Sequence, residues 1–446
     1  MPMMDRFLER TFQLRQRGSN LSREILAGIT TFGAVSYIVV VNPVILAPSQ
    51  AGLEPLIVGT ALAAMIGTLI MALWANLPIA LAPGMGTNVV FAQIVIVRMG
   101  LSYSTALTLV LVSAALFLLL AVTRLREKIV AGFPESIRVG MGCGIGLLIA
   151  YIGLNNGGLI SHVNGGLAFG ALTDGRVILG IIGLVLTPAL VAMGLPAALL
   201  LSIVLIAAAG LFVQGPDGVA LTRLPVHWLQ IPDLSHGLFI APDFGNYFLH
   251  LRSLAPVTLY FLLSAFFSTT ATLIAVTRRA GIIGADGNIP RFRQAYAADG
   301  LASVPGALLG MPTLGTYAES ATGVAAGGRT GLTAVVVAVL FGLSLFFWPV
   351  IAVIPSVATT PALVIVGLMM MESVLELRTD RPEDFAPAIL IMLVTVTTGD
   401  LMIGMALGCF AYTAIAIAAG RWRSITGMVM AIDGIFIAYM VLATKV

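Results

Sequence analysis

The feature that most constrains this chain is a series of long apolar runs that recurs from residue 25 almost to the end. Runs of about 18–25 apolar residues have the length that an α-helix needs to cross a bilayer. The chain is 59% hydrophobic and only 10% charged, whereas soluble domains carry about 25% charged residues. The sequence therefore excludes an ordinary water-soluble globule and predicts an all-α polytopic membrane protein.

Fifteen apolar segments can be delimited, and several are too short to cross a membrane alone. They span residues 25–47, 57–77, 79–98, 103–122, 136–154, 176–194, 196–214, 255–277, 299–312, 314–327, 330–354, 359–375, 385–398, 400–419 and 425–443. We expect about 14 transmembrane segments. The last run is then an extra crossing, a re-entrant piece or a surface helix.

Basic residues cluster between segments, where a membrane protein keeps its cytoplasmic loops. The clusters are Arg6 to Arg23, Arg124 to Lys128, Arg278 to Arg293, and Arg421 with Arg423. All of them lie on one side if each segment crosses once, which predicts a cytoplasmic N-terminus. Residues 1–24 are polar and basic, so we expect an amphipathic cytoplasmic lead-in and no cleaved signal peptide.

The segments fall into two halves of seven, residues 25–214 and 253–420, joined by a polar extracytoplasmic loop over 215–252 and followed by a hydrophobic segment in 421–446. Seven is odd, so the halves have opposite orientations. The third segment of each half is interrupted by glycine and proline, as PIALAPGMGTNVVFAQ (78–93) and GMPTLGTYAESATGVAAGG (310–328). Paired broken helices mark the binding site of many transporters, although the glycines could instead serve helix packing.

Two polar residues follow the breaks. Glu319 lies in the second broken segment, and an ionised carboxylate at mid-bilayer costs about 2.5–3.5 kcal/mol. We expect Glu319 to accept N–H groups of a substrate or to carry a coupling proton, the alternative being a structural carboxylate held by backbone amides. Asn88 occupies the comparable place in the first half. Its amide suits the edge of a heterocycle, or it caps a half-helix.

The eighth segment carries hydroxyls at helical spacing, which form either a binding face or a packing stripe. These are Ser264, Ser268, Thr269 and Thr272. Asp299 and Asp400 begin later segments and are expected to be interfacial caps. The chain shows no P-loop, metal-ligand cluster or nucleophile elbow, so we predict no cofactor, no metal ion, no nucleic-acid partner and no enzymatic activity.

Several stretches together resemble the xanthine/uracil permease superfamily, in particular its azaguanine-type branch of hypoxanthine, guanine and adenine permeases. They include EILAGITTFGAVSYIVVVNPVIL (24–46) and, most specifically, TYAESATGVAAGGRTG (316–331). The resemblance implies 14 segments in two inverted repeats, with short strands at segments 3 and 10. It also implies a core domain from segments 1–4 and 8–11, a gate domain from the rest, and a homodimer. The implied activity is proton-coupled uptake of a purine nucleobase across the inner or plasma membrane.

The eighth segment departs from the family pattern, because Ala265 and Ser268 stand where members usually carry two aspartates. A serine can hydrogen-bond a ring but carries neither a proton nor a charge at neutral pH. Glu319 is then expected to be the one mid-membrane carboxylate and the proton-coupling candidate. The predicted substrate-binding residues are Gly86, Asn88, Ser268, Thr272, Thr316, Glu319 and Ser320. Two alternatives stay open: a diverged permease, coupled or uncoupled, for another small polar solute or an anion, and a non-transporting sensor or scaffold.

Overall fold

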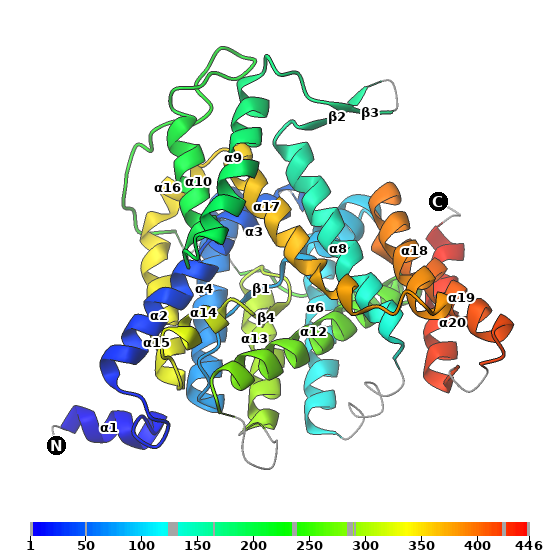
Figure 1. Ribbon diagram of the computed structural model, residues 1–446, viewed down its shortest axis with the longest axis horizontal. Coiled ribbons are helices and arrows are strands. Elements are labelled where there is room, and N and C mark those ends of the chain that lie inside the picture. Colours follow the sequence, from blue (N-terminus) through cyan, green and yellow to red (C-terminus); the bar gives the residue numbers. More distant parts are fainter. Residues whose placement is uncertain are drawn as a thin grey trace.

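The computed structural model describes residues 3–49, 51–123, 133–163, 166–233, 239–282, 289, 291–421 and 425–443. Most of these residues are helical (Figure 1). Within the described ranges, nine helices are long and apolar enough to cross a membrane, which confirms the prediction of a polytopic membrane protein. Of the predicted cytoplasmic cations, Arg124, Arg126, Lys128 and Arg423 lie outside the described residues.

The elements of the first half follow the predicted segments closely. They are α1 (Met3–Phe12), α2 (Leu21–Val35), α3 (Ile38–Leu46), η1 (Ala47–Ser49), α4 (Leu53–Ile70), η2 (Met71–Ala75), β1 (Leu81–Pro83), α5 (Met85–Val89), η3 (Val90–Arg98), α6 (Tyr103–Val122), α8 (Glu135–Asn156), β2 (Ile160–Val163), β3 (Gly166–Phe169), α9 (Gly175–Ala192) and α10 (Ala198–Ala209). The paired strands β2 and β3 were not predicted, since their residues read as a connection between helices.

The second half begins after the polar stretch. Its elements are α11 (Phe244–Leu249), α12 (Leu251–Arg279), α13 (Phe292–Leu308), β4 (Leu314–Thr316), α14 (Ser320–Ala325), α15 (Gly331–Ser344), η4 (Leu345–Phe347), α16 (Trp348–Ala352), α17 (Ser356–Met370), η5 (Glu372–Glu376), α18 (Pro382–Thr398), α19 (Leu401–Ala418) and α20 (Gly427–Ala443). Helix α20 covers the last apolar run and packs against α19 and α12.

The two broken segments meet through an antiparallel strand pair near the centre of the molecule (Figure 1). Leu81 pairs with Thr316, and Pro83 pairs with Leu314. The N–H of Gly84 also donates to the carbonyl of Thr313 at 2.9 Å. Proline and glycine disfavour a continuous helix here, and the predicted short strands at segments 3 and 10 are confirmed.

The outer edge of each strand is closed by one hydroxyl. Thr68 of α4 accepts a hydrogen bond from the N–H of Leu81 at 3.0 Å and donates to its carbonyl at 2.9 Å. Ser303 of α13 does the same for Leu314, at 3.1 and 3.4 Å. Open strand edges in an apolar interior need such partners because no water is available to them. The hydroxyls of Thr68 and Ser303 therefore allow two short strands to exist in the interior of a helical membrane protein.

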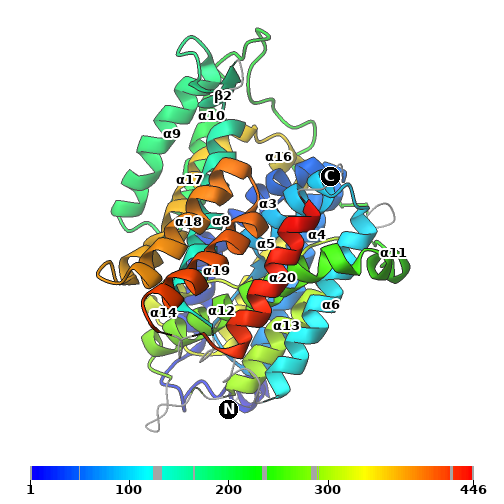
Figure 2. The same cartoon turned by 90° about the vertical axis from the view of Figure 1, so that its right-hand side faces the viewer.

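The helices around this pair form two groups. In one group α13 packs against α4 and α6, and α15 packs against α2 and α4. In the other group α8 packs against α17, α18 and α19, while α17 also contacts α9 and α10. Figure 2 shows α8, α17 and α18 together on one side and α6 with α13 on the other. The strand pair belongs to the first group through Thr68 and Ser303.

Candidate functional site

A cavity of about 730 Å³ lies where the strand pair faces α8, α12 and α17. Pockets for small molecules occupy about 300–1,000 Å³ and combine an apolar lining with a few polar groups. Both helix groups contribute to this cavity, so its walls come from separate packing units.

Five of the seven predicted site residues line this cavity. They are Gly86, Ser268, Thr272, Thr316 and Glu319. They come from segments far apart in the sequence, namely α5, α12, β4 and the turn before α14. The structure brings them together, and their part in binding a substrate stays a prediction.

Asn88 and Ser320 do not line the cavity, and both are fully buried. The amide of Asn88 donates to the side-chain oxygen of Asn42 on α3, and Asn42 in turn donates to Thr60 at 2.8 Å. The hydroxyl of Ser320 accepts the N–H of Ala80 at 3.0 Å. In this structure both residues hold the broken segments in place, and direct contact with a substrate stays a prediction.

Glu319 is partly buried and precedes α14. Its carboxylate accepts a hydrogen bond from the Tyr37 hydroxyl at 2.9 Å, and no other side chain of the described residues is seen to bond it. The neighbouring Tyr317 hydroxyl donates to the carbonyl of Pro83 at 2.6 Å. The Glu319 carboxylate thus has capacity left to accept hydrogen bonds from a molecule in the cavity.

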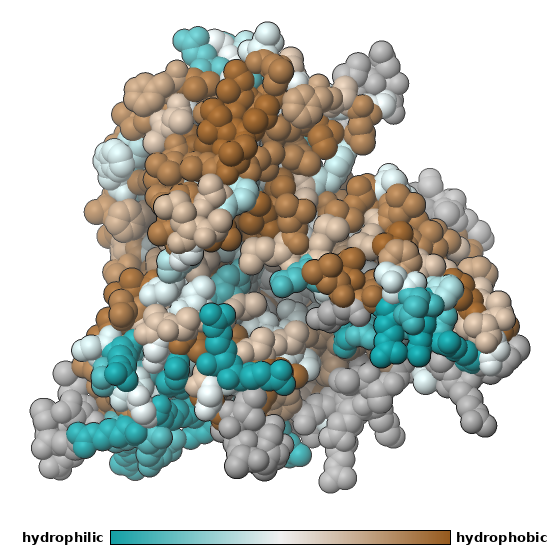
Figure 3. Space-filling view, in the orientation of Figure 1, coloured by the Kyte–Doolittle hydropathy of each residue, from teal (hydrophilic) through white to brown (hydrophobic). Residues whose placement is uncertain are grey.

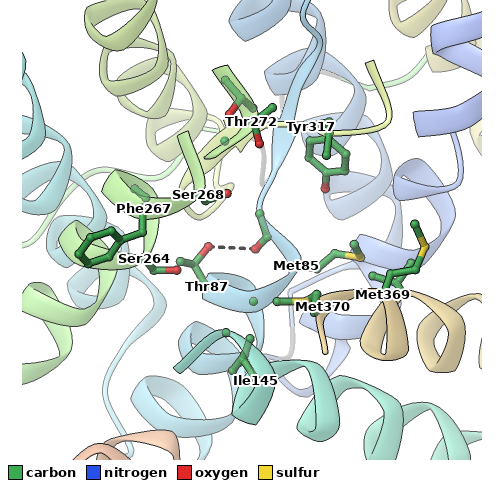
Figure 4. A pocket seen from close by; sticks show the side chains of 18 of the residues that line it. Met85, Thr87, Ile145, Ser264, Phe267, Ser268, Thr272, Tyr317, Met369 and Met370 are labelled. Carbon is green, nitrogen blue, oxygen red and sulfur yellow. Dashed lines mark hydrogen bonds between the residues drawn. The ribbon is translucent and has the colours of Figure 1, made fainter. Parts of the chain in front are cut away.

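The cavity carries hydroxyls on one side and thioethers on the opposite side. Figure 4 shows the hydroxyls of Ser264 and Ser268 on α12 facing a wall formed by Met85, Met369 and Met370. Thioethers are polarisable and flexible, so they pack well against flat aromatic rings. The sequence did not predict these methionines as site residues, because apolar residues near a helix end give no signal of function.

Two further hydroxyls at the cavity lack partners. Thr313 and Thr316 are buried, and their Oγ1 atoms make no hydrogen bond within the described part of the chain. Buried polar atoms are almost always paired, so a ligand or water is the expected partner. Such groups fit a ligand that carries both donors and acceptors.

Charged side chains mark the mouth of the cavity. Arg138 in the first turn of α8, Arg279 at the end of α12 and Glu372 after α17 all line it. The guanidinium of Arg138 lies 5.7 Å from the ring centre of Phe267. Figure 3 shows hydrophilic residues gathered in the lower part of the molecule, where Figure 1 places the N-terminus, below a hydrophobic upper part. Because these three charged residues lie at helix ends, we infer that the cavity opens toward that hydrophilic end.

At the opposite end, an ion pair joins the two helix groups. Arg98 at the end of η3 contacts the carboxylate of Asp400 at 2.7 Å, and the Tyr439 hydroxyl donates to the same carboxylate at 3.3 Å. Asp400 also accepts the N–H groups of Met402 and Ile403, so the predicted cap at the start of α19 is confirmed.

The prediction that Asp299 is an interfacial cap is wrong. Asp299 lies within α13 and is only 1% exposed, because the helix begins at Phe292 and not at residue 299. Its carboxylate accepts the Thr269 hydroxyl of α12 at 2.6 Å. Glu319 is therefore not the only carboxylate in the interior of this protein.

Comparison with solved structures supports the fold. The transmembrane domain of a cyanobacterial bicarbonate transporter, BicA, superimposes with a TM-score of 0.63 at 15% identity, covering 87% of this chain and 97% of that one. At this identity the likeness concerns the architecture alone.

Comparison with known sequences is more specific. The adenine permease AdeQ of Escherichia coli is 37% identical over 98% of this chain and 96% of its own length. The guanine/hypoxanthine permease PbuO of Bacillus subtilis is 37% identical over 94% and 97%. A permease family model of the xanthine/uracil type matches residues 22–401. The chain therefore belongs to the xanthine/uracil permease family and is a membrane transporter, not an enzyme.

Proposed function

We propose that this protein is a secondary active transporter that carries a purine nucleobase, such as hypoxanthine, guanine or adenine, across the inner or plasma membrane together with a proton. The observation that carries this proposal is the cavity beside the strand pair, where Glu319 lies among hydroxyls and thioethers. The names of the relatives, an adenine permease and a guanine/hypoxanthine permease, support the same class of substrate.

The lining suits the chemistry of a purine. Such a base has two flat apolar faces and an edge of ring N–H donors and nitrogen acceptors. Glu319 would accept a ring N–H, Thr316 and Ser268 would pair with the remaining edge, and Met85 and Met370 would pack on a face. The volume of about 730 Å³ accommodates a base and several waters.

The architecture that best accounts for this site is 14 segments in two inverted repeats. Thr68 lies 13 residues before Leu81 and Ser303 lies 11 residues before Leu314, and the two hydroxyls close equivalent strand edges. The same bridge at matching places in both halves supports an internal duplication. The group holding the strands would be the core domain, and the group of α8, α17, α18 and α19 would be the gate domain.

Transport would follow from movement between these groups. The cavity has walls from both, so a shift of the core against the gate closes one mouth and opens the other. With the N-terminus in the cytoplasm, the cavity seen here opens inward. Glu319 is one candidate for carrying the coupling proton, because its carboxylate can exchange a proton with cavity water in the open state.

A second candidate function is favoured by one observation. Arg138 and Arg279 line the same cavity, and two cations would suit an anionic solute. Competition of radiolabelled purine uptake by unlabelled purines, pyrimidines and small inorganic anions, in cells lacking their own permeases, separates the two. Inhibition by anions alone would favour the second candidate.

The test of the proposal is Glu319→Gln, with Glu372→Gln at the mouth of the cavity as the matched control. Removing a hydrogen bond to a charged group costs about 1.5–3 kcal/mol, so we expect purine affinity to fall by about 10- to 150-fold. Binding to purified protein and uptake by proteoliposomes measure it. Undiminished purine binding by Glu319→Gln, or an equal loss in both variants, would contradict the role of Glu319.

A further inference from the structure

Helix α13 holds a buried carboxylate, Asp299, that the transport mechanism above does not use. One oxygen accepts the hydroxyl of Thr269 at 2.6 Å. The other oxygen, Oδ1, is buried and has no hydrogen-bond partner among the described residues. Thr269 is adjacent to Ser268 and one turn before Thr272, and both of these residues line the cavity.

Asp299 also lies at the outer edge of β4. Ser303, one helical turn further along α13, accepts a hydrogen bond from the N–H of Leu314. The next outward-facing peptide N–H of the strand belongs to Thr316, and it interacts with the carboxyl of Asp299. Thr316 itself lines the cavity. The carboxyl is thus one layer behind the cavity and contacts two elements that carry cavity hydroxyls, α12 through Thr269 and β4 through Thr316.

The surroundings of this carboxyl are neutral. Helix α13 packs against α4, α6, α12, η2, β1 and β4, yet no charged side chain of the described residues is seen to act on Asp299. The nearby titratable groups bond elsewhere: Tyr296 to Thr270 and the carbonyl of Phe266, Tyr103 of α6 to the carbonyl of Gly310, Tyr317 to the carbonyl of Pro83, and Glu319 to Tyr37. Burying a carboxylate without a neighbouring positive charge costs several kcal/mol, and taking up a proton removes that cost.

We propose that Asp299 is the residue that takes up and releases the coupling proton, while Glu319 binds the base. This inference rests on the proposed function. Helix α12 contains no acidic residue, so it contributes no carboxyl to the cavity. The step is a simple exchange, in which a carboxylate oxygen of Asp299 gains a proton from cavity water and later returns it to water. A change of charge at Asp299 would then alter its interactions with Thr269 and Thr316, and thereby the geometry of the site.

The test compares Asp299→Asn with the unchanged protein in proteoliposomes, using the purine that the unchanged protein transports best. Two measurements are needed: exchange of labelled for unlabelled base without a gradient, and accumulation under an inward proton gradient. We expect the unchanged protein to accumulate base several-fold above equilibrium. Asp299→Asn should exchange base but accumulate none above equilibrium, and calorimetry in buffers of different ionisation enthalpy should show that base binding no longer takes up a proton.

Two further variants separate proton transfer from a structural role. Ser303→Ala removes the other strand-edge bond of α13, so it should lower thermal stability and keep gradient-driven accumulation. Adding Ser268→Asp to Asp299→Asn places a carboxyl on α12 beside Thr269 and should restore accumulation in part. Accumulation by Asp299→Asn at the unchanged level would overturn the proposal. So would loss of base binding and exchange together with accumulation. If the unchanged protein moves no purine, the proposed function fails first, independently of Asp299.

Discussion

The ion pair between Arg98 and Asp400 gives the sharpest test of alternating access. It joins η3 to α19, that is, the group with the strands to the group with α8, at the end opposite the cavity mouth. Movement that opens that end must break it. We predict that Arg98→Gln shifts the population away from the state seen here, because the substitution removes a bond that only this state makes.

The size of the shift follows from the exposure of the two side chains. Arg98 is 47% exposed and Asp400 is 0% exposed. Exposed pairs contribute about 0.2–1 kcal/mol, and removing one partner of a fully buried pair costs about 3–5 kcal/mol. Asp400 keeps Tyr439 and two peptide N–H groups, so we place the cost at about 1–2 kcal/mol, or about 5- to 30-fold in the equilibrium. Asp400→Asn is less informative because it also weakens the cap of α19.

The assay is the rate at which a thiol reagent labels Ser268→Cys in the cavity, with Cys143 and Cys409 replaced by alanine. If about nine-tenths of the molecules are in the open-cavity state, a tenfold shift of the equilibrium leaves about half of the molecules in that state. Arg98→Gln should therefore label about twofold more slowly. Tyr439→Phe removes only the 3.3 Å bond and serves as the matched control, with a smaller effect. An unchanged or faster rate in Arg98→Gln would refute the view that this pair holds the far end closed.

Two further predictions concern stability. Gly146→Ala places a methyl group 2.6 Å from the carbonyl oxygen of Gly367, and this overpacking of α8 against α17 should cost about 1–3 kcal/mol. Thermal unfolding in detergent measures it, and Gly142→Ala is the control because its added methyl meets nothing within 4 Å; equal melting temperatures would contradict the close contact. Thr68→Val leaves the N–H and carbonyl of Leu81 unpaired and should cost about 1–3 kcal/mol, whereas Thr68→Ser should be nearly neutral; a stable valine variant would show that the hydroxyl bridge is dispensable.

Sequence reasoning located most segments because apolar length and interruption are local properties. The two breaks were visible as glycine and proline in otherwise apolar runs, and the strands there are confirmed. Five of the seven predicted residues reached the cavity, since Gly86, Thr316 and Glu319 flank those breaks. The fold was thus largely predictable once the breaks and the family resemblance were combined.

Other features depend on contacts between distant segments and were missed. Asp299 looked like a boundary residue because Arg291 and Arg293 precede it closely, yet α13 begins at Phe292 and buries the acid against Thr269. Met369 and Met370 enter the site only because α17 packs beside α8. The partners of Asn88 and Ser320 are likewise set by tertiary packing, which their local sequence does not specify.

The register of the strand pair also limits which residue can occupy position 83 of β1. On β1, the peptide nitrogen of Leu81 faces outward to Thr68, and two residues later the nitrogen at Pro83 faces the same way. Proline has no hydrogen on that nitrogen, so nothing there needs an acceptor. Any other amino acid would introduce a peptide N–H at this position, which would need an acceptor. Proline usually interrupts a sheet, but at position 83 it is the residue whose backbone needs no additional hydrogen-bond acceptor.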